Sequence, residues 1–206
     1  MENTLERPSR QSAHLARQRA LFISAAQKTL AKSGLSATID EFAETAGVTV
    51  ATLYNHFPSK EALIQLAFVQ AIHDWEEWMR AAVAPLEDPA ERLVCSFRLF
   101  LRMSCTHPEI SRLASIAAAA GAPVIAATAA NAIAEIDELN HARGLVLTIP
   151  EKRFQSFFAA LLAEVQQQSL VADALAADAV VTLLLPLLGF SEVEAREQVS
   201  KPLPIS

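Results

Sequence analysis

The chain contains only two cysteines, Cys95 and Cys105, among 206 residues, and its polar, charged start lacks the apolar stretch of a secretory leader. Both features favour the cytoplasm, where thiols stay reduced. If one continuous helix carried both residues, the ten-residue separation would place them roughly 15 Å apart. We therefore expect two buried, unpaired thiols rather than a redox-active disulfide.

The sequence also lacks the residue spacings of metal sites and of common enzymes. His73, His107 and His141 are scattered, and no Cys/His spacing is typical of zinc. No glycine-rich phosphate loop, nucleophile elbow, HExxH motif or paired-carboxylate constellation occurs. We therefore expect no metal, no cofactor and no enzymatic activity.

No uninterrupted apolar run is long enough to predict a membrane span. The segment from Leu113 to Ala134 has no charged residue over 22 positions, but it is mostly alanine and Gly121-Ala122-Pro123 interrupts it. Two buried helices are the better interpretation, without membrane association. No strand, hairpin or internal repeat is evident, so the sequence predicts an all-α protein.

Charge is distributed unevenly along the chain, whose formal net charge is −6. Residues 1–62 carry +1, whereas residues 63–206 carry −7. Up to Lys32 there are six Lys or Arg and only two acids, so an N-terminal arm and first helix could neutralise phosphates. An acidic C-terminal body would leave any DNA contact to the N-terminal end.

Residues 38–60 predict two short helices joined by a tight turn, with a third helix directly after them. Thr38 and Glu41 have the spacing of a capping box, so a helix begins there. It ends at Gly47, because glycine accepts the left-handed conformation that closes a helix. Thr49 is a second N-cap candidate. Before this segment, a helix is expected from about Ala13 to Ser33, ending at Gly34.

The helix from about Val50 to Phe57 should bury Leu53 and Phe57 on one face. Its other face would expose Val50, Ala51, Thr52, Tyr54, Asn55 and His56. Hydroxyl and amide groups on such a face suit base edges and phosphates in the DNA major groove. Two alternatives stay open: Tyr54 could cap the small core with a half-buried ring, and His56 could be an ordinary surface histidine.

The segment from Arg17 to Leu63 resembles the DNA-binding domain of TetR-type transcriptional regulators. The matching motifs are Gly34, Thr38, Phe42-Ala43, Ala46-Gly47-Val48-Thr49, Leu53-Tyr54-Asn55-His56-Phe57 and Ser59-Lys60-Glu61-Ala62-Leu63. The resemblance implies an N-terminal helix-turn-helix domain, residues 1–62, and a helical effector-binding and dimerisation domain, residues 63–206.

The resemblance also implies roles for individual side chains. Thr38, Tyr54, His56 and Lys60 would contact phosphates, and Thr49 and Thr52 would be recognition-helix contacts. Val50 and Asn55 complete the expected DNA-binding set. This sequence departs from the family pattern, which most often has Lys and Gly at the positions of Val50 and Ala51, so Val50 could contact a thymine methyl instead. The loop from Gly34 to Thr38 is also one residue shorter than is common.

Glycine and proline divide the remaining chain into expected helices. Their expected bounds are about 59–84, 89–106, 108–120, 123–141, 150–169 and 173–188. Pro186 should end or kink the last helix one turn early. The last two are apolar nearly all round, so both of their faces must be covered.

A second copy of the chain is one way to cover these helices, and the resemblance implies a dimer through two late helices. The expected interface residues are Phe157, Leu161, Val165, Val180, Leu184, Leu187 and Leu188. A large monomeric core is the alternative. Two-fold symmetry would match a palindromic operator.

By resemblance, the middle helices should enclose a cavity for a small, largely apolar effector. The candidate lining residues are Trp75, Trp78, Phe97, Phe100, Leu101, Met103, Ile110, Leu113, Phe154 and Phe158. For most of these residues, plain core is favoured over pocket lining. The leading hypothesis is a dimeric, ligand-responsive transcriptional regulator, specifically a repressor, that binds double-stranded DNA. The alternative is a DNA-binding protein of the same fold without a small effector, controlled by a protein partner.

Overall fold

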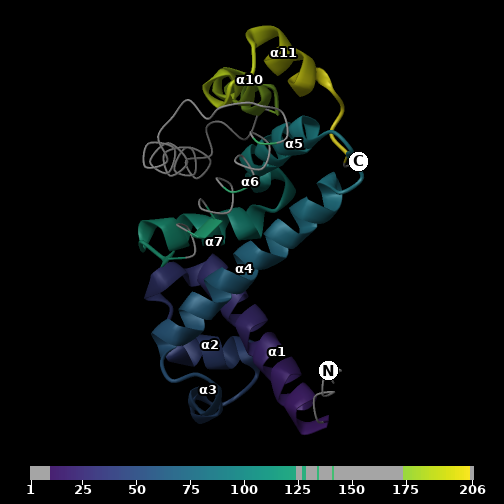
Figure 1. Cartoon of the computed structure of the whole chain (residues 1–206). Helices are drawn as coiled ribbons and strands as arrows, with labels where there is room; N and C mark the ends of the chain where they lie inside the picture. Colours follow the sequence, from purple (N-terminus) through teal and green to yellow (C-terminus); the bar gives the residue numbers. More distant parts are fainter. Residues whose placement is uncertain (1–9, 124–126, 129–133, 135–140, 142–173, 205–206) are drawn as a thin grey trace, which may run out of the picture. The chain divides into compact units, whose positions relative to one another are not determined.

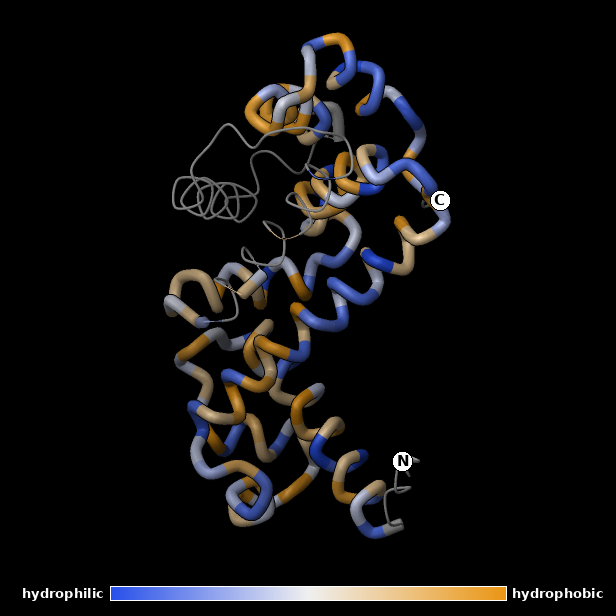
Figure 2. Tube along the Cα trace, viewed as in Figure 1, coloured by the Kyte–Doolittle hydropathy of each residue, from blue (hydrophilic) through white to orange (hydrophobic). Residues whose placement is uncertain are grey.

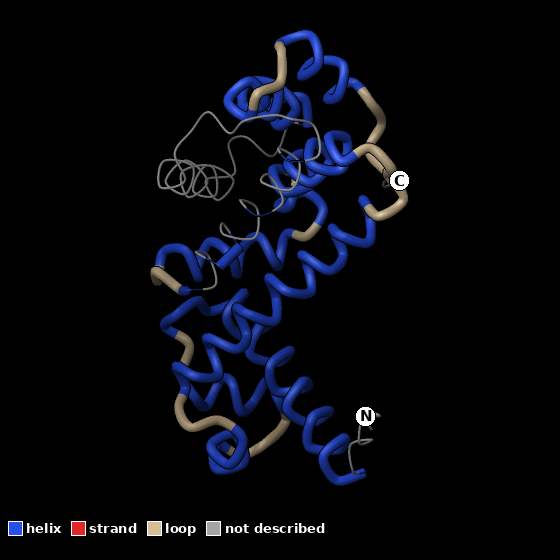
Figure 3. Tube along the Cα trace, viewed as in Figure 1, coloured by secondary structure: helices blue, strands red, loops and turns tan. Residues whose placement is uncertain are grey.

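The computed structural model describes residues 10–123, 127–128, 134, 141 and 174–204 (Figure 1). Within these ranges every regular element is a helix and no strand occurs (Figure 3), which confirms the all-α prediction. The elements are α1 (Arg10–Ser33), η1 (Gly34–Ser36), α2 (Ile39–Ala46), α3 (Val50–His56), α4 (Lys60–Val83), α5 (Pro89–Leu101), α6 (Met103–Thr106), α7 (Pro108–Ala119), α10 (Ala174–Leu184), η2 (Leu185–Leu188) and α11 (Glu192–Ser200). None of the described helices is long and apolar enough to cross a membrane.

The chain divides into two compact units, Met1–Gln70 and Ala71–Ser206. The division falls inside α4, so a single helix contributes residues to both units. The boundary expected after residue 62 lies earlier in the same helix.

Local signals in the N-terminal unit place its short helices. The Thr38 N–H donates to Glu41 Oε2 over 2.7 Å, and the Glu41 N–H donates to Thr38 Oγ1 over 3.3 Å, so the predicted capping box opens α2. Gly47 has φ +67 and closes the helix, with its N–H bonded to the Glu44 carbonyl. Gly34, with φ +64, follows the last residue of α1 as predicted.

The small core of the N-terminal unit is built from one face of each helix. Phe22 and Leu30 of α1, Phe42 of α2, and Leu53 of α3 are all buried. Phe57, directly after α3, is 2% exposed, so the predicted anchoring of this helix by Leu53 and Phe57 is confirmed.

The C-terminal unit packs around one large apolar cluster. Trp75 of α4, Val94 of α5, Val181 of α10 and Val199 of α11 belong to it. Helix α5 contacts both α10 and α11, and α6 contacts α7. Figure 2 shows α10 as a mostly hydrophobic segment, consistent with its place against this cluster.

One expected helix, 89–106, is wrong as a continuous element. It breaks at Arg102, which has φ −95 and ψ 6 and separates α5 from α6. The Arg102 guanidinium binds Asp178 of α10 over 2.7 Å, a tertiary contact accompanying the break. Cys95 and Cys105 therefore lie on different helices, and Cys105 is exposed rather than buried. Burial raises the pKa of the Cys95 thiol, as expected for an inert core cysteine.

At the C-terminal end, α10 stops at Leu184 and continues as the 3₁₀ segment η2, which contains Pro186. The predicted early end of this helix at Pro186 is thus confirmed. Helix α11 was not expected from the sequence. Its signal is present nevertheless, since Ser191 and Glu194 form a capping box. The expected helix 150–169 and nearly all of 123–141 lie outside the described residues.

Candidate nucleic-acid interface

Two threonine hydroxyls lie together at the start of α3. The Thr52 N–H donates to Thr49 Oγ1 over 3.2 Å, so Thr49 caps the helix. The two hydroxyl oxygens are 2.9 Å apart and share a hydrogen bond. Thr49 is exposed and Thr52 is partly exposed. The pair therefore presents donor and acceptor groups at the positive end of the helix, where an anionic partner is favoured.

The first turn of α3 carries no charge. Val50 is partly exposed at its first position, and Ala51 is exposed beside it. This surface offers methyl groups and backbone N–H groups. It can approach a thymine methyl closely, but it cannot hold a phosphate through a side-chain cation.

The last turn of α3 separates its polar side chains. Tyr54 is 48% exposed and Asn55 is exposed. The His56 ring instead packs edge-on against Phe22 of α1, with ring centroids 4.9 Å apart, and is partly buried. Tyr54 and Asn55 are therefore more accessible to a partner than His56.

Two further candidates lie at the starts of other helices. Thr38 is exposed at the N-cap of α2, where its hydroxyl takes part in the capping box. The Thr38 N–H, followed by the Ser33 hydroxyl, holds the pKa of Glu41 below its usual value. Lys60 is the first residue of α4, and Ser59 caps that helix through the Ala62 N–H at 3.1 Å.

Helix α1 supports the helix-turn-helix through polar contacts. Thr29 Oγ1 lies 2.9 Å from Thr45 Oγ1 of α2, and Gln27 Nε2 donates to the Ala67 carbonyl of α4 over 3.2 Å. Arg19 Nη1 donates to the His56 carbonyl at the end of α3 over 3.0 Å. No specific role was expected for Arg19, which is one of six Lys or Arg residues up to Lys32. Arg19 lies one turn before the buried Phe22, and this spacing is the sequence feature that could have indicated its contact with α3.

Comparison with known proteins agrees with this geometry. Residues 22–67 match the family model described as bacterial regulatory proteins, tetR family. These residues form a TetR-family DNA-binding domain. The match includes α2, α3 and the start of α4, and therefore every candidate DNA-binding residue named above.

The curated proteins that are similar to this chain are transcriptional regulators. The HTH-type transcriptional regulator RutR of Escherichia coli K12 is 36% identical over 107 residues, which is 50% of this chain and 49% of RutR. The HTH-type transcriptional regulator TtgR of Pseudomonas putida is 34% identical over 86 residues, covering 41% and 40% of the two chains. The chain thus spans about half or less of the length of these curated relatives.

Solved structures extend the similarity of fold to most of the chain. RolR in complex with resorcinol superposes with a TM-score of 0.64 at 23% identity, covering 94% of this chain and 98% of RolR. A gamma-butyrolactone receptor described as ArpA-like gives a TM-score of 0.62 at 19% identity, covering 90% and 95%. At such identities the similarity establishes the fold alone.

In the C-terminal unit, most expected effector residues lie in the apolar core. Trp75, Phe97, Phe100, Leu101 and Met103 belong to the main cluster, Trp78 and Ile110 pack against it, and Leu113 is buried. Phe154 and Phe158 lie outside the described residues.

A partly buried aromatic pair lies beside this cluster. The Trp78 ring meets the His107 ring edge-on, with centroids 4.2 Å apart, and burial lowers the pKa of His107. The His107 Nδ1 atom lies 3.0 Å from Thr106 Oγ1, so one ring nitrogen of the imidazole is already hydrogen-bonded within the chain.

The expected interface residues differ in their exposure. Leu184 and Leu188 are buried in their own chain's core cluster, whereas Leu187 is 38% exposed and Val180 partly so. Leu183, which the sequence did not single out, is 76% exposed on α10. Phe157, Leu161 and Val165 lie outside the described residues.

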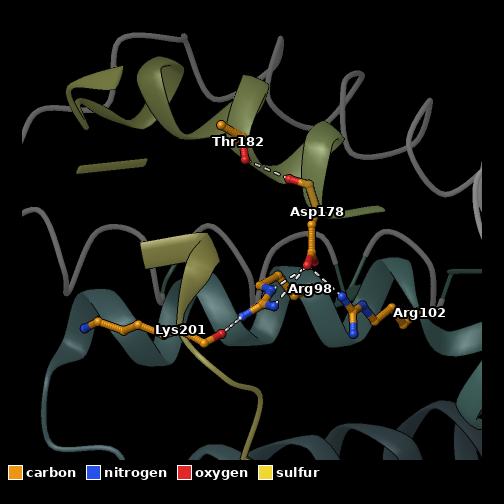
Figure 4. Close-up of polar contacts among 5 residues, drawn as sticks. All are labelled: Arg98, Arg102, Asp178, Thr182 and Lys201. Carbon is orange, nitrogen blue, oxygen red and sulfur yellow. Dashed lines mark hydrogen bonds and ion pairs between the residues drawn. The ribbon is translucent and has the colours of Figure 1, made fainter. Parts of the chain in front are cut away.

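A buried ion cluster joins α5, α10 and the C-terminal segment (Figure 4). Asp178 accepts two hydrogen bonds from Arg98, at 2.9 and 3.0 Å, and pairs with Arg102 at 2.7 Å. Arg98 also donates to the Lys201 carbonyl over 2.7 Å. Sequence reasoning missed this cluster. Asp178 is a charged residue within the apolar sequence of α10, and a charge that becomes buried there requires a partner of opposite charge.

Proposed function

We propose that this chain is a dimeric transcriptional repressor that binds a palindromic operator through α3 and is released by a small, largely apolar effector. The observation that carries the proposal is the hydroxyl pair of Thr49 and Thr52, presented at the start of a helix whose opposite face is anchored by Leu53 and Phe57. A helix held in this way offers polar groups to base edges without loosening the core.

The proposed DNA surface combines this pair with flanking contacts. Tyr54 and Asn55 extend the exposed face of α3, and Val50 supplies an apolar contact for a thymine methyl. Thr38 and Lys60, at the starts of the neighbouring helices, would hold phosphates on either side. His56 would contribute mainly through packing, because its ring lies against Phe22.

The effector proposal is supported by the composition of the C-terminal core. The cluster around Trp75 and Phe100 is almost entirely apolar, and His107 adds one polar group beside Trp78. The RolR structure, which has a similar fold, contains resorcinol. Helix α4 is the proposed lever because it contributes residues to both units. An effector would shift the population of DNA-binding conformations only through differential affinity for them.

Selection of binding sites from a random-sequence DNA pool tests the proposal. We expect the full chain to enrich a two-fold symmetric sequence whose half-sites are spaced by about one helical turn or slightly more. Enrichment of no sequence would contradict the proposal. If a symmetric site is enriched but no apolar compound weakens binding to it, the effector part of the proposal is wrong. Control by a protein partner would then be favoured.

Replacing Thr52 by alanine should weaken binding to the selected operator by about 1–3 kcal/mol and relax base preference at one position in each half-site. The reason is the loss of a hydroxyl that faces outwards beside Thr49. Fluorescence anisotropy on the operator and its single-base variants measures both effects. Thr52→Ser is the control, because it keeps the hydroxyl. Unchanged affinity and preference in Thr52→Ala would exclude Thr52 as a base contact.

Replacing Lys60 by alanine should weaken binding to operator and scrambled DNA alike, because a phosphate contact carries no sequence information. The slope of log affinity against log salt should become shallower by about one per Lys60 that contacts DNA. Lys60→Arg should keep the wild-type slope. A salt slope unaltered by Lys60→Ala would show that this side chain does not contact a phosphate.

A further inference from the structure

Arg19 makes two contacts with the C-terminal end of α3. Its Nη1 donates to the carbonyl of His56, the last residue of the helix, over 3.0 Å. The carbon of the same guanidinium lies 4.8 Å from the centroid of the Phe57 ring, within the range of a cation–π interaction. The planar group therefore caps the helix and covers the residue that anchors it.

Phe22, one turn further along α1, completes this contact. Its ring meets the His56 ring edge-on at 4.9 Å and the Phe57 ring at 6.5 Å. Helix α1 thus holds the last turn of α3 through an aromatic contact and a charged one. Only the charged contact reaches the backbone of α3.

The length of α3 makes such support consequential. At 7 residues the helix is too short to be stable by itself. The C-terminal end of a helix carries a partial negative charge and unpaired carbonyl groups, so a guanidinium placed there stabilises the helix. Thr49 caps the opposite end. The N-terminal end of α3 is therefore stabilised by its own cap, whereas its C-terminal end is held by contacts from α1.

We infer that Arg19 is a positioning residue that holds α3 in its DNA-binding orientation without contacting DNA itself. The inference rests on the proposed function, since the consequence is specific binding. When the contact is removed, α3 samples other orientations, and the apparent affinity falls by the fraction of time spent in the competent one. The loss applies to specific binding and leaves the number of phosphate contacts unchanged.

The chain offers a matched control. Arg17 is also an exposed arginine of α1, and within the described residues its Nε donates to the Ala13 carbonyl of its own helix, over 3.2 Å, rather than to α3. Arg19→Ala and Arg17→Ala remove the same charge two residues apart. Arg19→Lys keeps the charge but loses the planar group that stacks and donates together.

The experiment measures affinity and salt slope of full-length variants on the duplex that the wild-type chain enriches from a random-sequence pool. Arg19→Ala should lower specific affinity about tenfold, Arg19→Lys should restore only part of it, and both should keep the wild-type salt slope. A shallower slope in Arg19→Ala that Arg19→Lys restores would overturn the inference, because Arg19 would then be a phosphate contact. A specific affinity of Arg19→Ala equal to that of the wild-type chain would overturn it as well.

A second readout separates this inference from the proposed function. The Phe57 N–H is bonded to the Leu53 carbonyl over 2.9 Å and reports on the last turn of α3. Its hydrogen exchange should be faster in Arg19→Ala than in Arg17→Ala, even if no DNA sequence is enriched. Equal exchange rates in the two variants would show that Arg19 does not hold this turn, whereas failure to enrich DNA would contradict only the proposed function.

Discussion

Replacing Asp178 by alanine should lower the free energy of unfolding by about 3–5 kcal/mol. Asp178 is the shared partner of Arg98 and Arg102, and the Arg98 side chain is only 6% exposed (Figure 4). Removing the carboxylate leaves two guanidinium groups beside each other with no opposite charge between them. Arg98 keeps its bond to the Lys201 carbonyl, but both arginines lose the charge that offsets much of their removal from water.

Urea denaturation at a fixed protein concentration measures the effect. Glu192→Ala is the matched control, because it also removes the acid of an arginine pair in the same unit. Its partner Arg196 is 3.4 Å away, and both side chains are largely exposed. Glu192→Ala should lower the free energy of unfolding by less than about 1 kcal/mol. A similarly small loss in Asp178→Ala would show that the cluster contributes little beyond a surface ion pair.

Replacing Leu183 by glutamate should convert the proposed dimer to a monomer and lower operator affinity by roughly 10²–10⁴-fold. Leu183 is 76% exposed on the mostly apolar α10, so a second copy of the chain would bury it. A carboxylate at that position would have to be desolvated on association. Each monomer would then bind a single half-site without help from its neighbour.

Light scattering and anisotropy on the same sample test this prediction, and two control variants locate the effect. Leu184→Glu should unfold the chain, because Leu184 is 8% exposed and lies in its core cluster. Val193→Glu, at a 75% exposed position on α11, should leave mass and affinity unchanged. A dimeric Leu183→Glu protein with wild-type operator affinity would place the subunit interface elsewhere.

Features set by neighbouring residues could be predicted from the sequence. The Thr38–Glu41 capping box, the left-handed Gly47 and the helix end at Pro186 each depend on residues within one turn. The buried pair of Leu53 and Phe57 follows from helical spacing around α3. Together they place α2 and α3, which carry most of the candidate DNA-binding residues.

Features set by contacts between distant residues could not be predicted. Arg98 and Asp178 are 80 residues apart in sequence, and Arg19 and His56 are 37 apart. The residues around Arg98 and around Arg19 do not indicate which distant residue each arginine will contact. The break at Arg102 contains neither glycine nor proline, so helical periodicity continues through it. Leu183 and Leu184 are adjacent apolar residues, and only the packing of α10 distinguishes the exposed one from the buried one.

The central claim is that α3 reads a specific DNA sequence. Fluorescence anisotropy at about 0.15 M salt, comparing the selected operator with a scrambled duplex of equal length, tests it most directly, because salt sets the non-specific background. We expect the operator to bind at least about 10³-fold more tightly than the scrambled duplex, and Thr52→Ala to lower this ratio of affinities. Equal affinity for the two duplexes would contradict it.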